Sequence, residues 1–145
     1  MIRKVSLGHK VAQTAYKLNQ ALSKELKDFD IAPEQRVILE VVSKNSKISQ
    51  NELSQYLEKD KTTVSRTLDV IEKKGYITRK YIKEDKRIKY ITLTTLGEEI
   101  LENTKSIITE FRESTMKNFT EDEIETIFDF MDRLSANIEC NPNEK

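Results

Sequence analysis

The chain has 145 residues, of which 37% are hydrophobic and 34% are charged, with three Gly and two Pro. This length allows one domain with a hydrophobic core, and the scarcity of Gly and Pro favours helices over long loops. No run of about 18 apolar residues exists, and no apolar segment follows the first four residues, so neither a transmembrane helix nor a secretory signal is expected. The single cysteine, Cys140, cannot form an internal disulfide, which is typical of a cytoplasmic protein.

Basic and acidic residues are separated along the sequence, although the formal net charge is zero. Residues 1–60 carry 10 Lys and Arg against 8 Asp and Glu, residues 61–89 carry 10 against 4, and residues 98–145 carry 5 against 13. A basic middle segment followed by an acidic end favours one face that binds a polyanion.

Two helices are predicted in the first third of the chain. Apolar residues at steps of three and four predict a long helix that ends near Asp28. A second helix is expected to begin at Pro33, with Glu34 at its positive end, although Ala32 has no capping side chain. The apolar residues of the first helix are Leu7, Val11, Ala15, Leu18, Leu22 and Leu26, and those of the second are Val37, Ile38, Val41 and Val42.

Residues 49–75 predict two short helices joined by a tight turn, which is the helix-turn-helix arrangement. Ser49 and Glu52 form a capping box at the start of the first of these helices. Asp60 can cap the second, and Gly75 stands where a left-handed residue ends a helix. The predicted apolar faces are Leu53, Tyr56 and Leu57 in the first helix, and Val64, Leu68 and Ile71 in the second.

The period then changes from helical to alternating. Residues 76–82 and 87–93 are rich in β-branched and aromatic side chains, and the polar residues 83–86 between them suit a hairpin turn. A β-hairpin directly after a helix-turn-helix is a wing. The sequence therefore predicts a winged helix-turn-helix.

Two further helices are predicted after the hairpin. Thr95 with Glu98, and Thr120 with Glu123, each match a capping box. The apolar face of the first helix is Ile100, Leu101, Thr104, Ile107, Ile108 and Phe111, and that of the second is Ile124, Ile127, Phe128, Met131, Leu134 and Ile138. Together with residues 7–26, these faces exceed what one small winged domain can cover, which favours a homodimer.

The predicted fold is therefore mainly α with a small β-hairpin wing, a winged helix-turn-helix flanked by N- and C-terminal dimerisation helices. We expect residues 1–30 to form the N-terminal dimerisation helix and residues 31–94 the DNA-binding domain. Residues 95–140 are expected to form the C-terminal dimerisation helices, and residues 141–145 a disordered tail.

The second helix of the helix-turn-helix has the residues of a recognition helix. At about 100° per residue, the face opposite its apolar side carries Thr62, Arg66, Asp69 and Lys73, with Ser65 on the flank. Arginine can bond guanine O6 and N7 in two-pronged fashion, hydroxyl groups reach bases or phosphates, and the N–H groups of a first turn favour a phosphate. The predicted DNA contacts in this helix are Lys61, Thr62, Thr63, Ser65, Arg66 and Lys73.

Asp69 does not fit this pattern simply, because a carboxylate that faces phosphates repels them. Two explanations are open from the sequence: Asp69 accepts a hydrogen bond from a cytosine amine, or it pairs with Lys73 one turn further on.

A family resemblance rests on this region. Residues 60–79, DKTTVSRTLDVIEKKGYITR, resemble the recognition helix and first wing strand of MarR/SlyA-type transcriptional regulators, and the motif from Asp85 to Gly97 resembles that family's wing and its exit into a long helix. The order of elements agrees over about residues 7–139. The resemblance implies a homodimeric, ligand-responsive repressor whose first and last helices interlock and which binds a palindromic operator in double-stranded DNA.

The resemblance also assigns roles in the wing. Arg87 is expected to enter the minor groove and Asp85 to brace the wing, with Lys83 and Lys86 as further DNA contacts. It implies as well that a small aromatic effector binds between the dimerisation helices and the winged domain.

Other classes of function fit the sequence less well. His9 and Cys140, the single histidine and cysteine, lie at opposite ends of the chain, so neither a catalytic pair, a zinc site nor another cofactor is expected. The alternative that stays open is a winged helix that contacts only other proteins, without specific DNA readout. Steep salt dependence of binding to duplex DNA distinguishes the two.

Overall fold

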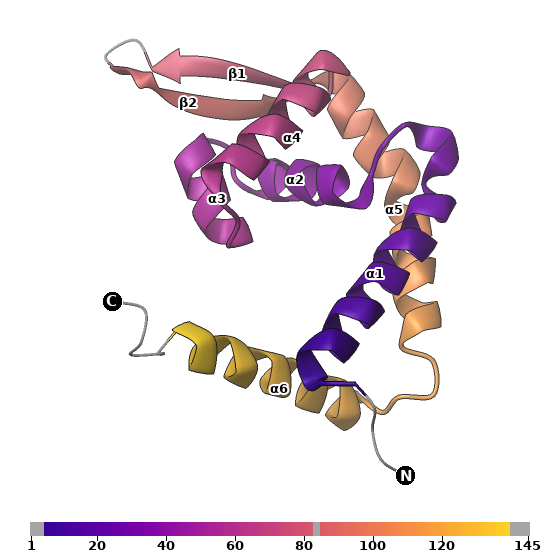
Figure 1. Cartoon of the computed structure of the whole chain (residues 1–145). Coiled ribbons are helices and arrows are strands. Elements are labelled where there is room, and N and C mark those ends of the chain that lie inside the picture. The colour runs from indigo at the N-terminus through magenta and orange to yellow at the C-terminus, as the bar shows by residue number, and fades with distance from the viewer. Residues whose placement is uncertain (1–4, 83–84, 140–145) are drawn as a thin grey trace. The chain divides into compact units, whose positions relative to one another are not determined.

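The computed structural model describes residues 5–82 and 85–139, which form helices and one two-stranded antiparallel sheet (Figure 1). The chain divides into two compact units, Met1–Ile108 and Thr109–Lys145. The mainly helical fold with a hairpin wing is therefore confirmed. The predicted tail, residues 141–145, and Cys140 lie outside the described residues.

The first unit begins with α1 (Leu7–Glu25), a short 3-10 turn η1 (Lys27–Phe29) and α2 (Pro33–Lys44). The helix-turn-helix follows as α3 (Gln50–Leu57) and α4 (Lys61–Lys73), and the hairpin as β1 (Ile77–Ile82) and β2 (Asp85–Leu93). The helix α5 (Thr95–Thr115) leads into the second unit, where α6 covers Glu121–Glu139. The predicted order of elements is confirmed along the described chain.

The core of the first unit lies where α2, α3, α4, α5 and the hairpin meet. Val64, Leu68 and Ile71 are 1%, 0% and 0% exposed, as predicted for the inner face of α4. Thr104 is also completely buried, on the predicted inner face of α5. The other fully buried large side chains are Leu26, Leu39, Leu53, Ile77 and Ile91.

Three expectations about faces and caps were wrong. Val37 in α2 is 46% exposed and Tyr56 in α3 is 69% exposed, because α2 buries Leu39 and α3 buries Ser54, each two residues away and therefore on the opposite side of its helix. The cap of α5 is Thr94 and not Thr95: the hydroxyl of Thr94 accepts a hydrogen bond from the N–H of Gly97 at 3.0 Å.

Local hydrogen bonds explain the other helix starts. The Ser49 hydroxyl accepts from the N–H of Glu52 at 3.1 Å, and Thr120 and Glu123 cap each other at 3.0 and 3.1 Å. At α2, where Ala32 offers no side-chain cap, the Gln35 side chain accepts from the N–H of Ala32 at 3.1 Å. The capping box predicted at residues 120–123 is thus confirmed. At residues 49–52 the Ser49 cap is confirmed, but the Glu52 carboxylate accepts from the Ser49 hydroxyl at 3.1 Å instead of reaching the backbone N–H.

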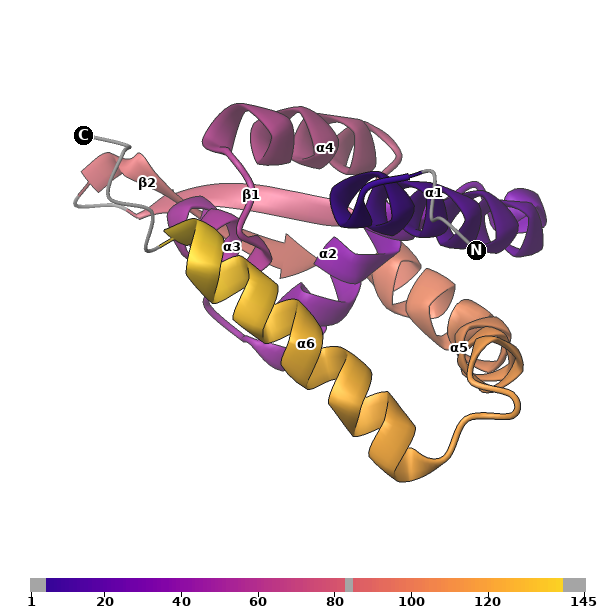
Figure 2. The same ribbon diagram turned by 60° about the horizontal axis from the view of Figure 1, so that its bottom comes forward.

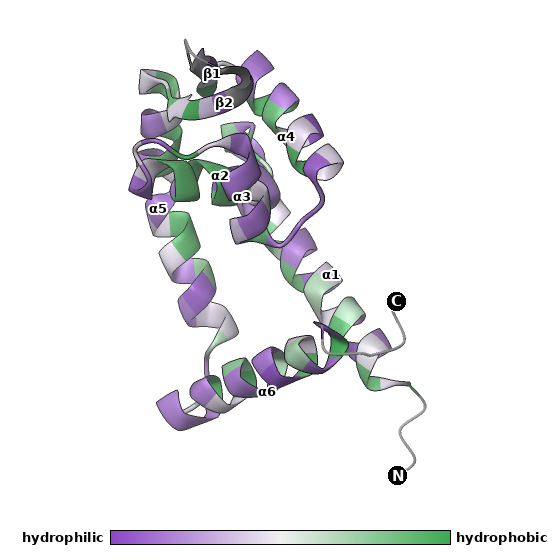
Figure 3. Cartoon of the chain, turned by 90° about the vertical axis from the view of Figure 1, so that its left-hand side faces the viewer, coloured by the Kyte–Doolittle hydropathy of each residue, from purple (hydrophilic) through white to green (hydrophobic). Residues whose placement is uncertain are grey.

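Apolar side chains on α1 and α6 remain uncovered within the chain. Neither helix contains a buried residue, and apolar and hydrophilic bands alternate along α6 (Figure 3). Phe128 is 62% exposed and Ile138 is 69% exposed, while Leu7 in α1 is 59% exposed. Within the described part of the chain, no helix combines the length and apolar character needed to cross a bilayer.

Candidate DNA-binding surface

The two helices of the helix-turn-helix are joined by a fixed turn. Glu58 takes the left-handed conformation, with φ of 52°, directly after α3. Asp60 then begins α4: its carboxylate accepts from the N–H of Thr63 at 2.8 Å and from the Thr63 hydroxyl at 2.7 Å. The hydrogen bond from the Thr63 side chain has the larger effect and the one from the Thr63 N–H the smaller, and both hold the pKa of Asp60 below its ordinary value of 3.8. The cap is therefore charged at neutral pH.

The C-terminal end of α4 is equally well defined. Gly75 has φ of 83°, its N–H bonds the carbonyl of Glu72 at 2.9 Å, and the N–H of Tyr76 bonds the carbonyl of Ile71 at 3.0 Å. These two bonds form a Schellman motif, which the glycine predicted. With both ends fixed and one face buried, α4 presents its opposite face in a defined orientation.

That opposite face carries the predicted DNA contacts. Lys61, Thr62, Thr63, Arg66 and Lys73 are exposed, and Ser65 is half-buried. The Thr63 hydroxyl donates to Asp60, so it can meet DNA only as an acceptor or through its methyl group. The remaining side chains are available to bases and phosphates along the face.

Asp69 has a different partner from the one considered for it. Its carboxylate accepts a hydrogen bond from Nη2 of Arg79 in β1, and not from Lys73. Arg79 also bonds both carboxylate oxygens of Glu72, at 3.0 and 3.2 Å. Of the two explanations left open from the sequence, the pairing with Lys73 is therefore wrong, because the partner comes from the strand, ten residues away in sequence.

The wing is an antiparallel hairpin in which Ile77 pairs with Leu93 and Arg79 with Ile91. It projects to one side beyond α3 and α4 in both views (Figures 1 and 2). The ammonium group of Lys89 lies over the ring of Tyr81, 5.4 Å from its centre. Lys83 and the side chains of Asp85, Lys86 and Arg87 lie outside the described residues, so their roles stay predictions.

Lys80 and Lys89 were not among the predicted contacts. Lys80 is exposed on β1, and Lys89 is half-buried on β2. The alternation of residues 76–82 and 87–93 could have placed them on the hairpin, but it does not say which face of a hairpin meets DNA.

Known proteins share both this sequence pattern and this geometry. Residues 29–88 match the MarR family model. YybA of Bacillus subtilis strain 168, a helix-turn-helix-type transcriptional regulator, is 27% identical over 129 residues, which cover 89% of this chain and 86% of YybA. The winged helix-turn-helix region of this chain is thus similar in sequence to the MarR family.

Solved structures of similar proteins have the same fold. The Staphylococcus aureus MepR–DNA complex matches with a TM-score of 0.85 and 25% identity, over 92% of this chain and 99% of that one. A mutant of Escherichia coli MarR complexed with operator DNA matches with a TM-score of 0.81 and 27% identity, over 88% of this chain and 92% of that one. The fold of this chain is thus one that these two proteins have in their complexes with DNA.

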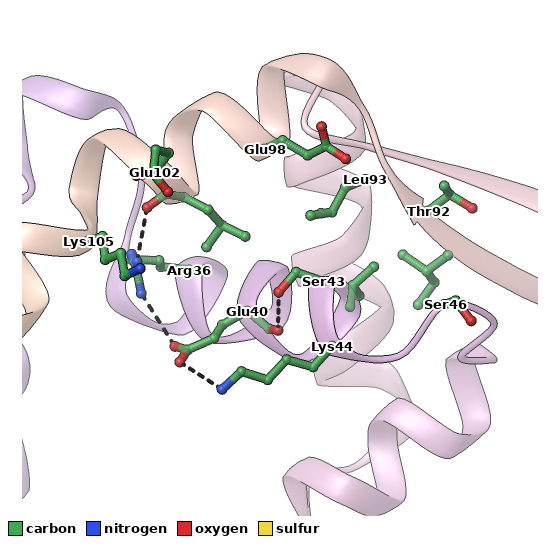
Figure 4. Close-up of a pocket in the computed structure, with 13 residues that line it drawn as sticks. Arg36, Glu40, Ser43, Lys44, Ser46, Thr92, Leu93, Glu98, Glu102 and Lys105 are labelled. Carbon is green, nitrogen blue, oxygen red and sulfur yellow. Dashed lines mark hydrogen bonds and ion pairs between the residues drawn. The ribbon is translucent and has the colours of Figure 1, made fainter.

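The chain also contains a pocket, bounded by α2, β2 and the first half of α5 (Figure 4). Its volume is about 620 Å³. Apolar side chains form part of the wall, and charged groups line the rest. The lining includes Val42, Ile91, Leu93 and Leu101 together with Arg36, Glu40, Lys44, Glu98, Glu102 and Lys105.

Arg36 ties α2 to α5 at the edge of this pocket. Its side chain is 8% exposed, its Nε donates to the Thr104 hydroxyl at 2.7 Å, and its Nη2 donates to the carbonyl of Leu101 at 3.2 Å. Glu40 lies 3.4 Å from Arg36 and 3.4 Å from Lys44. Sequence reasoning missed Arg36, because the two partners that hold it on α5, Thr104 and Leu101, lie more than 60 residues away.

The structure gives no sign of a metal site in the segments it covers. Within residues 5–82 and 85–139, no three His, Cys, Asp or Glu side chains gather as metal ligands would. His9 is exposed on α1.

Proposed function

We propose that this chain is a repressor that binds a pseudo-palindromic operator as a homodimer and releases it in response to a small ligand. The observation that carries the DNA contact is the arrangement of α4. Its inner face is completely buried, its ends are capped, and Arg66 stands exposed beside Thr62 on the outer face. A rigid helix with these side chains fits the major groove, where an arginine reads guanine.

We assign DNA contact to the residues predicted from the sequence. Thr62, Ser65 and Arg66 are proposed to reach bases, and the others to bind phosphates or, in the wing, the minor groove. Lys61, Thr63, Lys73, Lys83 and Lys86 are the proposed phosphate contacts, Arg87 is the minor-groove residue, and Asp85 braces the wing. The S. aureus MepR and E. coli MarR complexes with DNA support this use of the fold.

The homodimer is supported by the uncovered helix faces. The apolar face of α6 has Ile127 and Met131 at 43% and 41% exposure besides Phe128, in a helix with no buried residue. A contiguous apolar face of this kind marks an interface. A second copy of the chain is the partner we propose, with α1 and α6 of the two copies in contact.

The ligand response is assigned to the pocket between α2, β2 and α5. Its apolar wall suits an aromatic ring, and Lys44 and Lys105 suit a carboxylate or phenolate. A ligand in this pocket would lie between α5 and β2. It would shift the conformation of the winged domain only if it bound one conformation of that domain more tightly than another.

Selection of operators from random duplex DNA, followed by fluorescence anisotropy, tests the DNA-binding proposal. We expect a two-fold consensus, tight binding that weakens steeply with salt, and two chains per duplex. A protein-interaction module would instead give no consensus and little salt dependence. A reporter gene controlled by the selected operator tests whether binding represses transcription.

Benzoate and phenol serve as probes of the pocket by isothermal titration. Lys105→Ala is expected to weaken benzoate binding, whereas Lys117→Ala, an exposed lysine that does not line the pocket, should not. Equal binding by both variants and the wild type would remove the pocket from the proposal.

A further inference from the structure

We propose that Arg79 is a positioning residue that fixes the wing against the recognition helix, so that the two parts contact DNA as one coupled unit. This inference rests on the proposed function, because it concerns how the same surface reads its operator. It assigns a role to a residue that itself does not have to touch DNA.

The first observation is the geometry of the charged cluster. The guanidinium of Arg79 in β1 binds Glu72 with two hydrogen bonds, from Nε at 3.2 Å and from Nη2 at 3.0 Å, and its Nη2 also donates to Asp69. Asp69 and Glu72 lie on successive turns of α4. A planar guanidinium held by two carboxylates has one allowed orientation, which a lysine ammonium would not have.

The second observation is where this cluster lies on the hairpin. Arg79 pairs with Ile91 across the sheet. The N–H of Ile91 in turn bonds the carbonyl of Ile48 at 3.1 Å, and Tyr90 forms an isolated bridge with Ser49, the cap of α3. One rung of the hairpin is therefore tied on one strand to α4 and on the other strand to the start of α3.

The hairpin projects beyond this rung and the neighbouring Tyr90–Ser49 bridge. Lys80 pairs with Tyr90, and Tyr81 with Lys89, on the next two rungs. Figures 1 and 2 show the hairpin continuing past the two helices. The orientation of this projecting part relative to α4 is determined at the Arg79–Ile91 pair, which we call the root of the wing.

The third observation is that the cluster is charged and partly shielded from water. The side chain of Arg79 is 11% exposed, against 40% for Glu72 and 63% for Asp69. The hydrogen bond with Arg79 lowers the pKa of Glu72 from its ordinary value of 4.5, and the bond with Glu72 raises the pKa of Arg79. A guanidinium this buried needs its carboxylates, since an unpaired charge there would be strongly destabilising.

The consequence for DNA binding is energetic coupling. With the root fixed, a shift of α4 in the major groove also shifts Lys89 and the wing, so the contacts of the two parts are made or lost together. Without Arg79, the wing can follow the DNA backbone independently of α4, and the contacts become independent. Residues that share one rigid unit show non-additive effects in double-mutant cycles.

The test is a double-mutant cycle on a selected operator, with Arg66→Ala in α4 and Lys89→Ala in the wing. In the wild-type background the double variant should lose about fivefold less affinity than the product of the single losses. In an Arg79→Met background the affinity loss of the double variant should equal the product of the two single losses. In an Arg79→Lys background the coupling should lie between that of the wild type and that of Arg79→Met. Lys80→Met, the next residue on the strand, is the matched control and should leave the coupling intact.

A general loss of folding would give a different result, because it lowers operator and random-duplex binding by the same factor. Should Arg79→Met fail to fold, Glu72→Gln removes the two-pronged partner and is expected to reduce the coupling in the same direction. If the coupling between Arg66 and Lys89 is unchanged in folded Arg79→Met or Glu72→Gln protein, this inference is wrong and the proposed function is unaffected. Absence of any sequence preference in the wild type overturns it together with the proposed function.

Discussion

Gly97, in the first turn of α5, lies directly against the backbone carbonyl of Tyr76, so that a Cβ on Gly97 would overlap the carbonyl oxygen. The same oxygen accepts a hydrogen bond from the N–H of Thr94 at 3.1 Å. The start of the long helix is thereby packed onto the segment that joins the recognition helix to the wing. Only glycine fits at this contact.

Gly97→Ala is therefore expected to destabilise the fold by about 1–3 kcal/mol or more, because the clash is with backbone and cannot be relieved by a rotamer change. Thermal or chemical denaturation measures the loss. Gly8→Ala in α1 is the matched control: no neighbouring group lies within 4 Å of the position that its Cβ would occupy, so the helix should be unchanged or slightly more stable. Equal stability of the two variants would contradict the close packing.

Arg66→Ala should relax base preference at one position of each half-site, with a loss of discrimination of about 1–3 kcal/mol. Lys73→Ala, also exposed on α4, should instead weaken binding to all sequences and lower the salt slope by about one. The two variants differ because a phosphate contact carries no sequence information. If both variants lost the same affinity for the operator as for random duplex, the base-contacting face of α4 would have been assigned wrongly.

Acid is expected to weaken the junction between α4 and the wing. Arg79 lowers the pKa of Glu72 in the folded chain from an ordinary value of 4.5, so the unfolded chain binds the proton more tightly. The stabilisation is present above about pH 4.5 and is lost as the pH falls below that value through the folded pKa.

Glu72→Gln removes this dependence. At about pH 6 the variant should be less stable than the wild type by about 0.2–1 kcal/mol, as for other partly exposed ion pairs, and the difference should shrink towards about pH 3. Urea denaturation at both pH values measures it. A difference that grows on acidification would contradict the sign of the shift.

The features that the sequence predicted are those encoded by neighbouring residues. Ser49 with Glu52, Asp60 and Gly75 each act within one helical turn, so their side chains or backbone freedom determine the local structure directly. The buried face of α4 follows from helical spacing in the same way. Local patterns of this kind were enough to predict the helix-turn-helix and the order of the elements.

The features that were missed depend on partners distant in sequence or on a choice between equivalent neighbours. Arg36 is buried because Thr104 and the Leu101 carbonyl receive its hydrogen bonds, and no local pattern shows this. Asp69 is paired by a strand residue for the same reason. Thr94 and Thr95 both satisfy a capping pattern, and the packing around Gly97 decides between them.

The last prediction concerns the homodimer, because the two-fold operator depends on it. A protein with one recognition helix per chain reads two half-sites about 10 base pairs apart, centre to centre, when two chains are linked. Linkage makes binding of the second half-site effectively intramolecular, which raises the affinity far above that of one module. The apolar face of α6, with Phe128 at its exposed centre, is the surface we assign to this linkage.

Truncation before Thr120 removes this whole face, and truncation after Glu139 leaves it intact as the control. The shorter chain should sediment as a monomer or aggregate, and should bind the palindrome hardly better than a single half-site. Phe128→Asp should act in the same direction, whereas Asp129→Asn, one residue further on the exposed polar side, should not. A chain truncated before Thr120 that stays dimeric with full operator affinity would show that α6 has another role, because the linkage would then have to come from α1 or from elsewhere on the chain.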